Sequence, residues 1–241
     1  MAQQMDVEAY VARYGHDWTD PEKVMDYVSR SDAQEDRYAA LKYMAAFVNF
    51  DRSLKIHILD IGAGQGVVGA AILDEFPASV AVGLDVSEPM KDLALERMAR
   101  YGDRFTYHIG DFADGELPGD LGGPFDVAVS SRAIHHLPAA QKAALYKDIC
   151  AHLTPGGCFF NLDSFGPAHE ALAPIYRAAG RSLRGEPRNA ETTRGGGQRI
   201  LVGHYYESLE TNLAALRAAG FEPVDIFWKN MNTALIGGYK P

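Results

Sequence analysis

The sequence has only two cysteines, Cys150 and Cys158, and they do not form a C-x-x-C pair. Their spacing argues against a disulfide framework or a zinc site, so we expect both to be reduced thiols in the protein core. No apolar run is long enough to span a bilayer, which excludes a membrane helix. The N-terminus lacks a basic region followed by an apolar stretch, so no signal peptide is expected. These absences predict a cytoplasmic protein.

The chain also lacks a surplus of positive charge, because its formal net charge is −9. This charge argues against broad binding to a phosphate backbone. One basic cluster is an exception, and such clusters usually form a solvated face; its members are Arg177, Arg181, Arg184, Arg188, Arg194 and Arg199. At 241 residues and 47% hydrophobic content, the chain is expected to form one α/β domain with appended segments.

From residue 56 onward, apolar strands alternate with amphipathic helices, which predicts a parallel sheet covered on both faces. Strands are expected at 56–61, 79–85, 104–109, 125–130 and 158–163, with a Thr-Pro-Gly-Gly turn before the fifth. A helix at 208–219 then precedes two apolar stretches at 223–229 and 234–240. Their four-residue linker is too short for a helical crossover, so these two strands must be antiparallel.

Two further segments are expected to emerge near the carboxyl ends of the strands, where open α/β sheets bind ligands. Residues 1–53 have a helical pattern, with helices at 7–14 and 21–48 and an interruption near 29–32. Residues 164–205 include the run R-G-G-G-Q at 194–198, which is expected to be mobile. We interpret both segments as a lid over the site.

One short stretch says most about a ligand. Residues Ile56 to Gly66 read I-H-I-L-D-I-G-A-G-Q-G, an apolar strand with an acid near its end and three alternate glycines after it. The glycines permit a tight turn and close approach of the backbone to a bound molecule. The residues after them predict a helix whose N–H groups point at the turn. Because a carboxylate at Asp60 repels phosphate and attracts an ammonium group, the loop predicts a positively charged nucleoside such as S-adenosylmethionine.

Two other interpretations of the loop are open. Residues 64–69 read G-Q-G-V-V-G, the spacing of a dinucleotide fingerprint, but this match starts too late after the strand and sets Asp60 against a pyrophosphate. A glycine turn without a ligand is the second alternative. The antiparallel hairpin predicted at 223–240 adds independent weight against a nicotinamide cofactor.

In motif order the chain resembles the class I S-adenosylmethionine-dependent methyltransferases, in particular the small-molecule branch. The resemblance covers residues 54–240 and rests on L-D-I-G-A-G-Q-G, V-S-E-P-M, G-D-F, F-D-V-A-V-S-S-R-A-I-H-H-L and L-T-P-G-G. It implies an α/β, Rossmann-like fold with a seven-stranded, mostly parallel sheet of order 3214576, an antiparallel last strand and helices on both faces. It also implies a methyltransferase domain at 54–241 with a lid insertion at 164–205, preceded by an N-terminal helical lid at 1–53.

The resemblance also assigns the cofactor contacts. It places Asp60 and the glycine loop at the methionine ammonium, Asp85 at both ribose hydroxyls and Asp111 at the adenine amino group. Ser130 and Ser131 end the fourth strand beneath the sulfonium, where relatives often carry Asn at position 131. The residues expected to bind S-adenosylmethionine are Asp60, Gly62, Ala63, Gly64, Gly66, Asp85, Val86, Met90, Asp111, Phe112, Ser130 and Ser131.

Methyl transfer from a sulfonium needs alignment and exclusion of water, and it needs a base only where the acceptor loses a proton. His135, His136 and Asp163 are the candidate catalytic residues, because imidazole titrates near neutral pH and Asp163 can act as a base or anchor an amine. Adjacent histidines on a short helix point in different directions, so at most one is expected to face the acceptor. No metal is expected, because no Asp-Asn pair follows the relevant strand.

The expected partner is a small-molecule methyl acceptor held by lid residues, which are Tyr14, Trp18, Tyr27, Arg194, Arg199, His204 and Tyr205. Aromatic side chains suit an apolar or planar acceptor, and arginines suit a carboxylate or phosphate. Two other functions are open: carboxy-S-adenosylmethionine-dependent modification of tRNA wobble uridine, and cofactor binding by a catalytically silent protein. The net negative charge counts against a nucleic-acid partner. The sequence sets neither the acceptor atom nor the oligomeric state.

Overall fold

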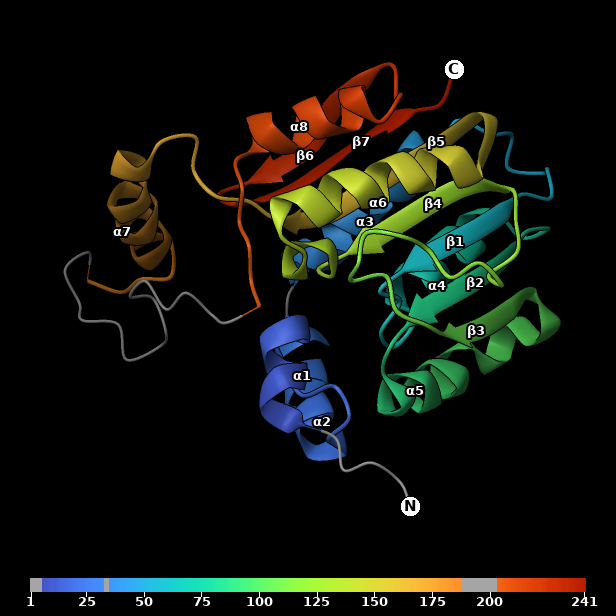
Figure 1. Cartoon of the computed structure of the whole chain (residues 1–241), viewed down its shortest axis with the longest axis horizontal. Coiled ribbons are helices and arrows are strands. Elements are labelled where there is room, and N and C mark those ends of the chain that lie inside the picture. Colours follow the sequence, from blue (N-terminus) through green and yellow to red (C-terminus); the bar gives the residue numbers. More distant parts are fainter. Residues whose placement is uncertain (1–5, 33–34, 188–202) are drawn as a thin grey trace.

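The computed structural model describes residues 6–32, 35–187 and 203–241. Within them, seven strands form one sheet in the order β3-β2-β1-β4-β5-β7-β6, as Figure 1 shows. The strands are β1 His57–Ile61, β2 Val80–Asp85, β3 Phe105–Ile109, β4 Phe125–Ser131, β5 Leu153–Ser164, β6 Val224–Asn230 and β7 Thr233–Tyr239. The sheet order predicted from the resemblance is confirmed.

The direction of the last strand is confirmed as well. Strands β1 to β5 pair in parallel, whereas β7 pairs antiparallel with β5 on one side and with β6 on the other. Asn230 of β6 pairs directly with Thr233 of β7, so the connection is a tight turn. Such a turn can join antiparallel strands but not parallel ones.

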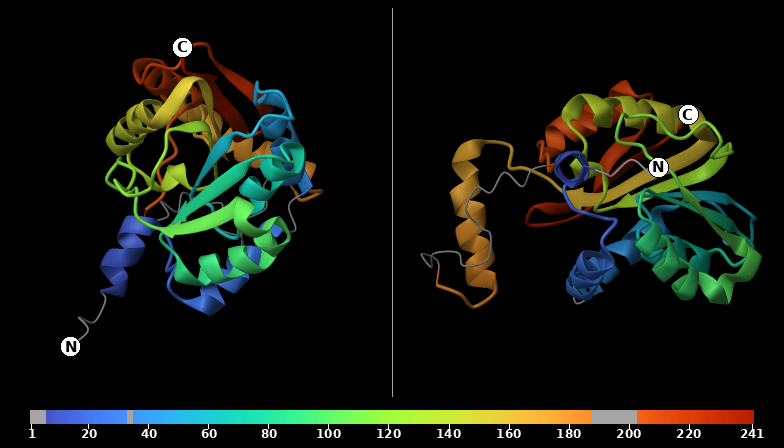
Figure 2. Two further views of the ribbon diagram at one scale, coloured as in Figure 1. Left: turned by 90° about the vertical axis from the view of Figure 1, so that its right-hand side faces the viewer. Right: turned by 60° about the horizontal axis from the view of Figure 1, so that its bottom comes forward.

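Helices cover both faces of the sheet (Figure 2). One face packs against α3 (Glu35–Phe47), α4 (Val67–Glu75) and α5 (Glu88–Met98), and the other packs against α6 (Ala139–His152) and α8 (Leu209–Ala218). Successive residues of β1 serve opposite cores, with Ile58 in the first and Leu59 in the second. This double burial explains why the parallel strands are apolar almost throughout.

The remaining helices have different surroundings. α1 (Val7–Tyr14) and α2 (Pro21–Asp32) lie next to the lower end of the sheet in Figure 1, whereas α3 buries Leu41 and Met44 in the main core. The lid role of residues 1–53 stays a prediction. α7 (Ala173–Leu183), preceded by the short turn η3 (Glu170–Leu172), stands apart from the sheet and has no buried residue. Among the described residues, no helix is both long and apolar enough to cross a membrane.

Two local features differ from the sequence-based expectation. The Thr154–Gly157 stretch does not separate α6 from the fifth strand, because β5 already begins at Leu153. Leu153 pairs with Phe125 and Cys158 with Val127, so the four residues form an irregular insertion within β5. Gly156 takes a φ of 79° there, which favours glycine. The sequence predicts only a lid insertion for residues 164–205, without assigning a helix there, whereas the structure forms α7 over Ala173–Leu183.

Candidate cofactor and acceptor site

The glycine loop joins β1 to α4 in a conformation that only glycine adopts readily. Gly62, Gly64 and Gly66 have φ values of 68°, 52° and 78°. A Cβ on Gly62 would lie 2.1 Å from the Cβ of Ala133, so the loop also has no room for a side chain there. The loop is fixed from outside, because the Gly64 N–H donates to Asp85 Oδ2 at 2.8 Å and its carbonyl accepts from the Tyr107 hydroxyl at 2.9 Å.

A cavity that is partly open to solvent lies at the carboxyl ends of the strands, where the strand order reverses from β1 to β4. This is where open α/β sheets place their ligands. The predicted cofactor residues that line it are Gly62, Ala63, Gly64, Asp85, Val86, Met90, Asp111, Phe112 and Ser131. The predicted acceptor residues Tyr14, Trp18 and Tyr27 line the same cavity, as does His136.

Three of the predicted cofactor residues, Asp60, Gly66 and Ser130, are not among the lining residues. Asp60 is fully buried behind the loop, where its Oδ2 accepts from the Gly69 N–H at 2.8 Å. Its Oδ1 has no hydrogen-bond partner among the described residues. Burial raises the pKa of Asp60 to about 7. Ser130 donates its hydroxyl to the Ile61 carbonyl and so ties β4 to β1.

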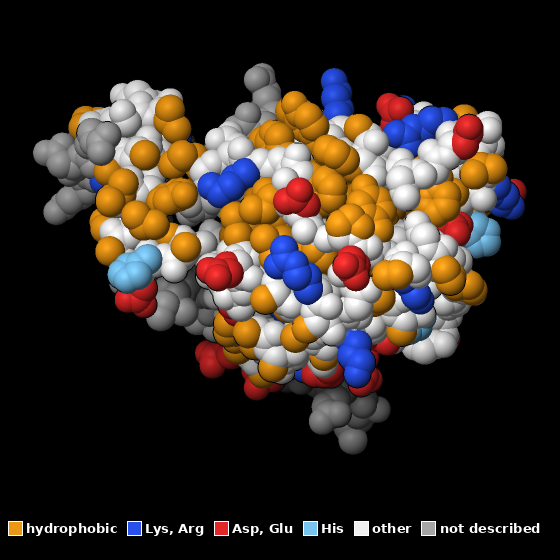
Figure 3. Space-filling model, turned by 90° about the horizontal axis from the view of Figure 1, so that it is seen from above, with side chains coloured by type: hydrophobic (Ala, Val, Ile, Leu, Met, Phe, Trp, Pro, Cys, Tyr) orange, Lys and Arg blue, Asp and Glu red, His pale blue; other side chains and the backbone are white. Residues whose placement is uncertain are grey.

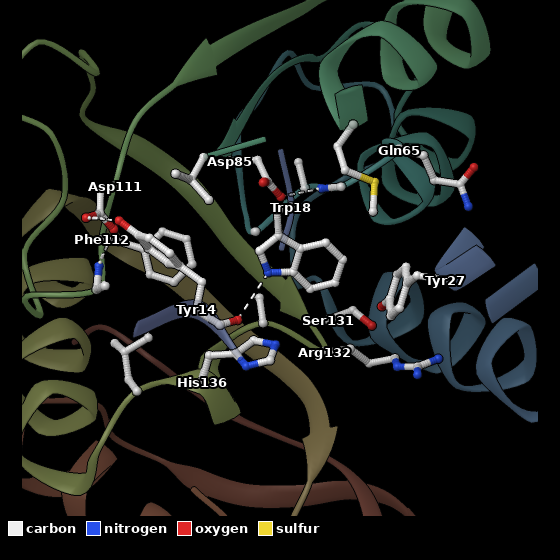
Figure 4. Close-up of a pocket in the computed structure, with 18 of the residues that line it drawn as sticks. Tyr14, Trp18, Tyr27, Gln65, Asp85, Asp111, Phe112, Ser131, Arg132 and His136 are labelled. Carbon is white, nitrogen blue, oxygen red and sulfur yellow. Dashed lines mark hydrogen bonds between the residues drawn. The ribbon is translucent and has the colours of Figure 1, made fainter. Parts of the chain in front are cut away.

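Asp85 is the last residue of β2, and Asp111 lies just after the end of β3. Both side chains line the cavity (Figure 4). Asp85 accepts one backbone N–H on each oxygen, from Gly64 and from Ser87. A carboxylate oxygen has two acceptor sites, so each can take a further hydrogen bond from a ligand hydroxyl. Burial raises the pKa of Asp85.

Residues of α1 already bind Asp111. Its Oδ2 accepts from Arg13 Nη2 at 2.7 Å and from the Tyr14 hydroxyl at 2.8 Å, and its Oδ1 accepts from the Ala113 N–H. Burial alone would raise the pKa of Asp111, but the Ala113 N–H, Arg13 and Tyr14 outweigh burial and hold the pKa below its usual value. Arg13 also pairs with Asp114. The N-terminal helix is therefore tied to the segment after β3 at the edge of the cavity.

Trp18 lies in the middle of the close-up in Figure 4, with Asp85 on one side and His136 on the other. Its indole Nε1–H donates to the Tyr14 carbonyl at 3.1 Å, and its own carbonyl accepts from the Ser87 hydroxyl at 2.6 Å. The Tyr27 ring packs edge-on at 5.1 Å from the indole. The loop between α1 and α2 thus puts an aromatic wall inside the cavity.

The three predicted catalytic residues form one connected group. His135 and His136 belong to the short turn η2 (Ile134–His136), and His135 Nδ1 lies 2.6 Å from Asp163 Oδ1 at the end of β5. Burial alone would raise the pKa of Asp163, but the His135 ring and the N–H groups of Ser164 and His135 lower it. Burial and the neighbouring His135 ring lower the pKa of His136 well below its usual value, so its imidazole is neutral at pH 7. Of the three, only His136 lines the cavity.

The other predicted acceptor residues divide into two groups. His204 is buried and its ring stacks on His135 at 5.2 Å, whereas Tyr205 is exposed and donates its backbone N–H to the His135 carbonyl. Neither is a lining residue of the cavity. Arg194 and Arg199 lie outside the described residues, as does the R-G-G-G-Q run predicted to be mobile.

Several lining residues were missed from the sequence, among them Arg37 and Arg132. Arg37 comes from α3 and is largely buried near Asp60; burial lowers its pKa. No motif marks it, because its position depends on how α3 packs on the sheet. Arg132 directly follows the fourth strand and has a φ of 61°, a strained conformation for a residue with a side chain. Its place after the V-S-S run could have singled it out.

Comparisons with known proteins agree with this geometry. Residues 58–157 match the family model described as a methyltransferase domain. A malonyl-[acyl-carrier protein] O-methyltransferase of Geobacter sulfurreducens is 28% identical over 218 residues, which cover 86% of this chain and 73% of the relative. A cypemycin N-terminal methyltransferase of a Streptomyces species is 38% identical over 114 residues, which cover 46% of this chain and 42% of the relative.

The solved structure of PigF with SAH aligns with the whole of this chain at a TM-score of 0.63 and 18% identity. At that identity the likeness concerns the fold. The chain spans 64% of PigF and 42% of the cypemycin enzyme, so both are longer proteins.

Proposed function

The chain belongs to the class I S-adenosylmethionine-dependent methyltransferases, and we propose that it transfers the methyl group of this cofactor to a small-molecule acceptor by in-line displacement. The observation that carries the acceptor class is the aromatic lining of the cavity. Tyr14, Trp18 and Tyr27 roof it from α1, α2 and the loop between them. An acceptor has to fit into this aromatic space beside the cofactor, which favours a small molecule over an exposed polymer.

The residues around the cavity fit S-adenosylmethionine. The buried Ser131 hydroxyl in the cavity wall has no hydrogen-bond partner among the described residues, as expected of a group that meets a ligand. Asp85 has spare acceptor sites for the two ribose hydroxyls, and Asp111 can accept from the adenine amino group. Arg37 offers a guanidinium for the methionine carboxylate. Asp60 lies behind the glycine loop, and a bound ammonium group would favour its charged form.

The cofactor supplies a methyl group on a sulfonium, which is already an activated leaving group. The chain's part is therefore to align the acceptor and to exclude water. Trp18 and Tyr27 help to exclude water, because their rings line the cavity. His136 is the predicted catalytic residue that borders the acceptor space, and His135 and Asp163 stand behind it.

The remaining parts of the proposal concern context. On the face seen in Figure 3, lysine, arginine, aspartate and glutamate side chains are interspersed, which does not favour a polyanion partner on that face. A cytoplasmic location agrees with two buried, free cysteines. Residues 54–241 are the proposed catalytic domain, with 1–53 and 164–205 as lid segments.

Labelled methyl transfer tests this proposal. The protein would be incubated with S-adenosylmethionine labelled in its methyl group and with an acceptor panel that includes malonyl thioesters, since the Geobacter relative is named for malonyl-acyl-carrier protein. We expect label in a small-molecule product, which mass spectrometry would identify. Label in tRNA, or turnover only with the carboxylated cofactor, would favour the wobble-uridine alternative. Tight cofactor binding without turnover on any acceptor would favour the silent protein.

A further inference from the structure

Four imidazoles from separate parts of the chain meet beside the cofactor cavity. His16 comes from the loop between α1 and α2, His135 and His136 from η2, and His204 from the segment before α8. We call this group the histidine cluster. The ring of His136 lies 4.2 Å from that of His135 and 4.5 Å from that of His204, centroid to centroid. His16 stands edge-on to His204 at 5.1 Å. Ring nitrogens of His135, His136 and His204 all lie within 4.8 Å of one another.

Hydrogen bonds at Nδ1 fix the orientation of two of these rings, those of His135 and His136. His136 Nδ1 lies 2.9 Å from the Gly203 carbonyl oxygen, and because that oxygen can only accept, Nδ1 carries the hydrogen. Its Nε2 is then the nitrogen with the lone pair. His135 Nδ1 lies 2.6 Å from Asp163 Oδ1 in the corresponding way. A carbonyl or carboxylate behind Nδ1 is the usual support of a histidine that binds a metal through Nε2.

The backbone is shaped to bring the rings together. Gly15 has a φ of 75°, and a Cβ there would lie 2.5 Å from His136 Nδ1 and 2.8 Å from His204 Cε1. Gly203 also has a positive φ, and a Cβ there would lie 2.6 Å from the Gly15 nitrogen. Any side chain at either position would push apart the two segments that carry His16 and His204. Glycine is therefore required for this cluster to form.

The His204 segment is also anchored from the other side. The Tyr205 N–H donates to the His135 carbonyl at 2.7 Å. The buried Lys142 on α6 donates to the Tyr205 carbonyl and to Glu207. These contacts hold the backbone that directly follows His204.

From this geometry we infer that His135, His136 and His204 bind one divalent transition-metal ion of the zinc class. Imidazole nitrogen suits Zn²⁺, Co²⁺ and Ni²⁺, and three protein ligands with one open position are typical of a catalytic zinc site. Zinc–nitrogen distances of 2.0–2.1 Å set tetrahedral ligands about 3.4 Å apart, so metal binding has to draw the three rings together from the 4.8 Å within which their nitrogens now lie. The buried carboxylate of Asp163 behind His135 offsets part of the charge of the ion.

The fourth coordination position of the proposed metal ion would face the cavity. His136 is the member of the cluster that lines the cavity. A metal on its Nε2 would therefore sit at the edge of the acceptor space, where an oxygen of the acceptor can serve as the fourth ligand. This last step rests on the proposed function, whereas metal binding by the cluster does not. The inference departs from the sequence-based expectation of no metal, which considered oxygen ligands in an Asp-Asn pair.

Cobalt binding tests the inference directly. Protein without an affinity tag, stripped with a chelator and dialysed, would be titrated with Co²⁺ by calorimetry and visible absorption. We expect one Co²⁺ per chain, visible ligand-field bands typical of tetrahedral nitrogen ligation, and displacement by Zn²⁺. His204→Gln should weaken Co²⁺ binding at least about 100-fold because it removes one of three ligands. His57→Gln, which changes an exposed histidine outside the cluster, should leave Co²⁺ binding unchanged.

Other outcomes overturn the inference. Absence of ligand-field bands in the wild-type protein, or equal Co²⁺ binding by wild type and His204→Gln, would assign the cluster to packing. If the stripped wild type also kept full methyl transfer while His136→Gln lost it, the general-base prediction would replace the metal. Circular dichroism and titration with S-adenosylmethionine would accompany each variant, because His204 lies off the cofactor cavity. Loss of metal binding can then be told apart from loss of cofactor binding or of methyl transfer.

Discussion

Asp85 connects the glycine loop to the ligand, since its two oxygens hold the backbone N–H groups of Gly64 and Ser87 while they face the cavity. Replacement by Ala would remove the loop's support as well as the ligand contact. Asp85→Asn keeps an acceptor and removes the charge, so it should lower S-adenosylmethionine affinity about 10- to 100-fold. Calorimetric titration measures this loss. Asp92→Asn, at an exposed position on α5, is the matched control; unchanged affinity in Asp85→Asn would contradict the ribose assignment.

Arg37 permits a test of which part of the cofactor a single side chain binds. If its guanidinium binds the methionine carboxylate, Arg37→Gln should weaken S-adenosylmethionine about 10- to 100-fold but leave decarboxylated S-adenosylmethionine unaffected. The ratio of the two affinities is independent of any general loss of stability. Arg30→Gln, on the exposed face of α2, serves as control. Equal losses for both cofactors would exclude the carboxylate contact.

Asp60 predicts a pH dependence of folding. Its pKa is about 7 in the folded protein against an ordinary value of 3.8, so between these pH values the folded state keeps the proton while the unfolded state loses it. Stability should therefore fall as pH rises from about 4 to about 7, by up to about 4 kcal/mol. Asp60→Asn should remove this part of the dependence and be more stable than wild type at pH 8. Urea unfolding at pH 5 and pH 8 measures it; parallel curves for both proteins would refute the prediction.

At the scale of elements, we expect α1 to act as a latch on the cavity. Arg13 and Tyr14 hold Asp111, yet the Arg13–Asp111 pair is more than one-third exposed, so it contributes at most about 1 kcal/mol. A weakly held segment beside a binding cavity affects the rates of binding and release more than the affinity. Arg13→Ala should therefore speed both binding and release of S-adenosylmethionine several-fold, with little change in their ratio.

Trp18 provides the signal for this measurement, because it lies in the cavity and Trp228 is the only other tryptophan. Stopped-flow fluorescence in a Trp228→Phe background would follow binding and release. Arg30→Ala breaks an exposed ion pair on α2 and is the control. An unchanged release rate in Arg13→Ala would mean that α1 does not gate the cavity.

The elements were predictable from the sequence to different degrees. The parallel strands, the glycine turn and the position of Asp85 at the end of a strand follow from local sequence signals, whereas the order of the seven strands came from the resemblance to a known family. Arg13 and Arg37 could not be predicted, because only the packing of α1 and α3 brings them to the cavity. The turn at 154–157 has the residues of a loop, but pairing of Leu153 with Phe125 draws it into β5.

For the whole molecule, the cofactor assignment predicts selective stabilisation. A ligand that binds the folded chain at 100 times its Kd adds about 2.7 kcal/mol. In a protein of this size that corresponds to a rise in Tm of about 5–10 °C. S-adenosylmethionine should produce this rise and NAD⁺ should not, as differential scanning calorimetry would measure. An equal rise with NAD⁺ would revive the dinucleotide interpretation of the glycine loop.

The position of β7 constrains the order in which the sheet can form during synthesis. It lies between β5 and β6, although it is the last of these strands to be synthesised. Until Thr233–Tyr239 has left the ribosome, β5 presents an open edge and β6 has no partner in the sheet. An open edge of this kind can pair with another chain. The nascent protein therefore carries an unpaired β5 edge until the β6–β7 hairpin closes the sheet.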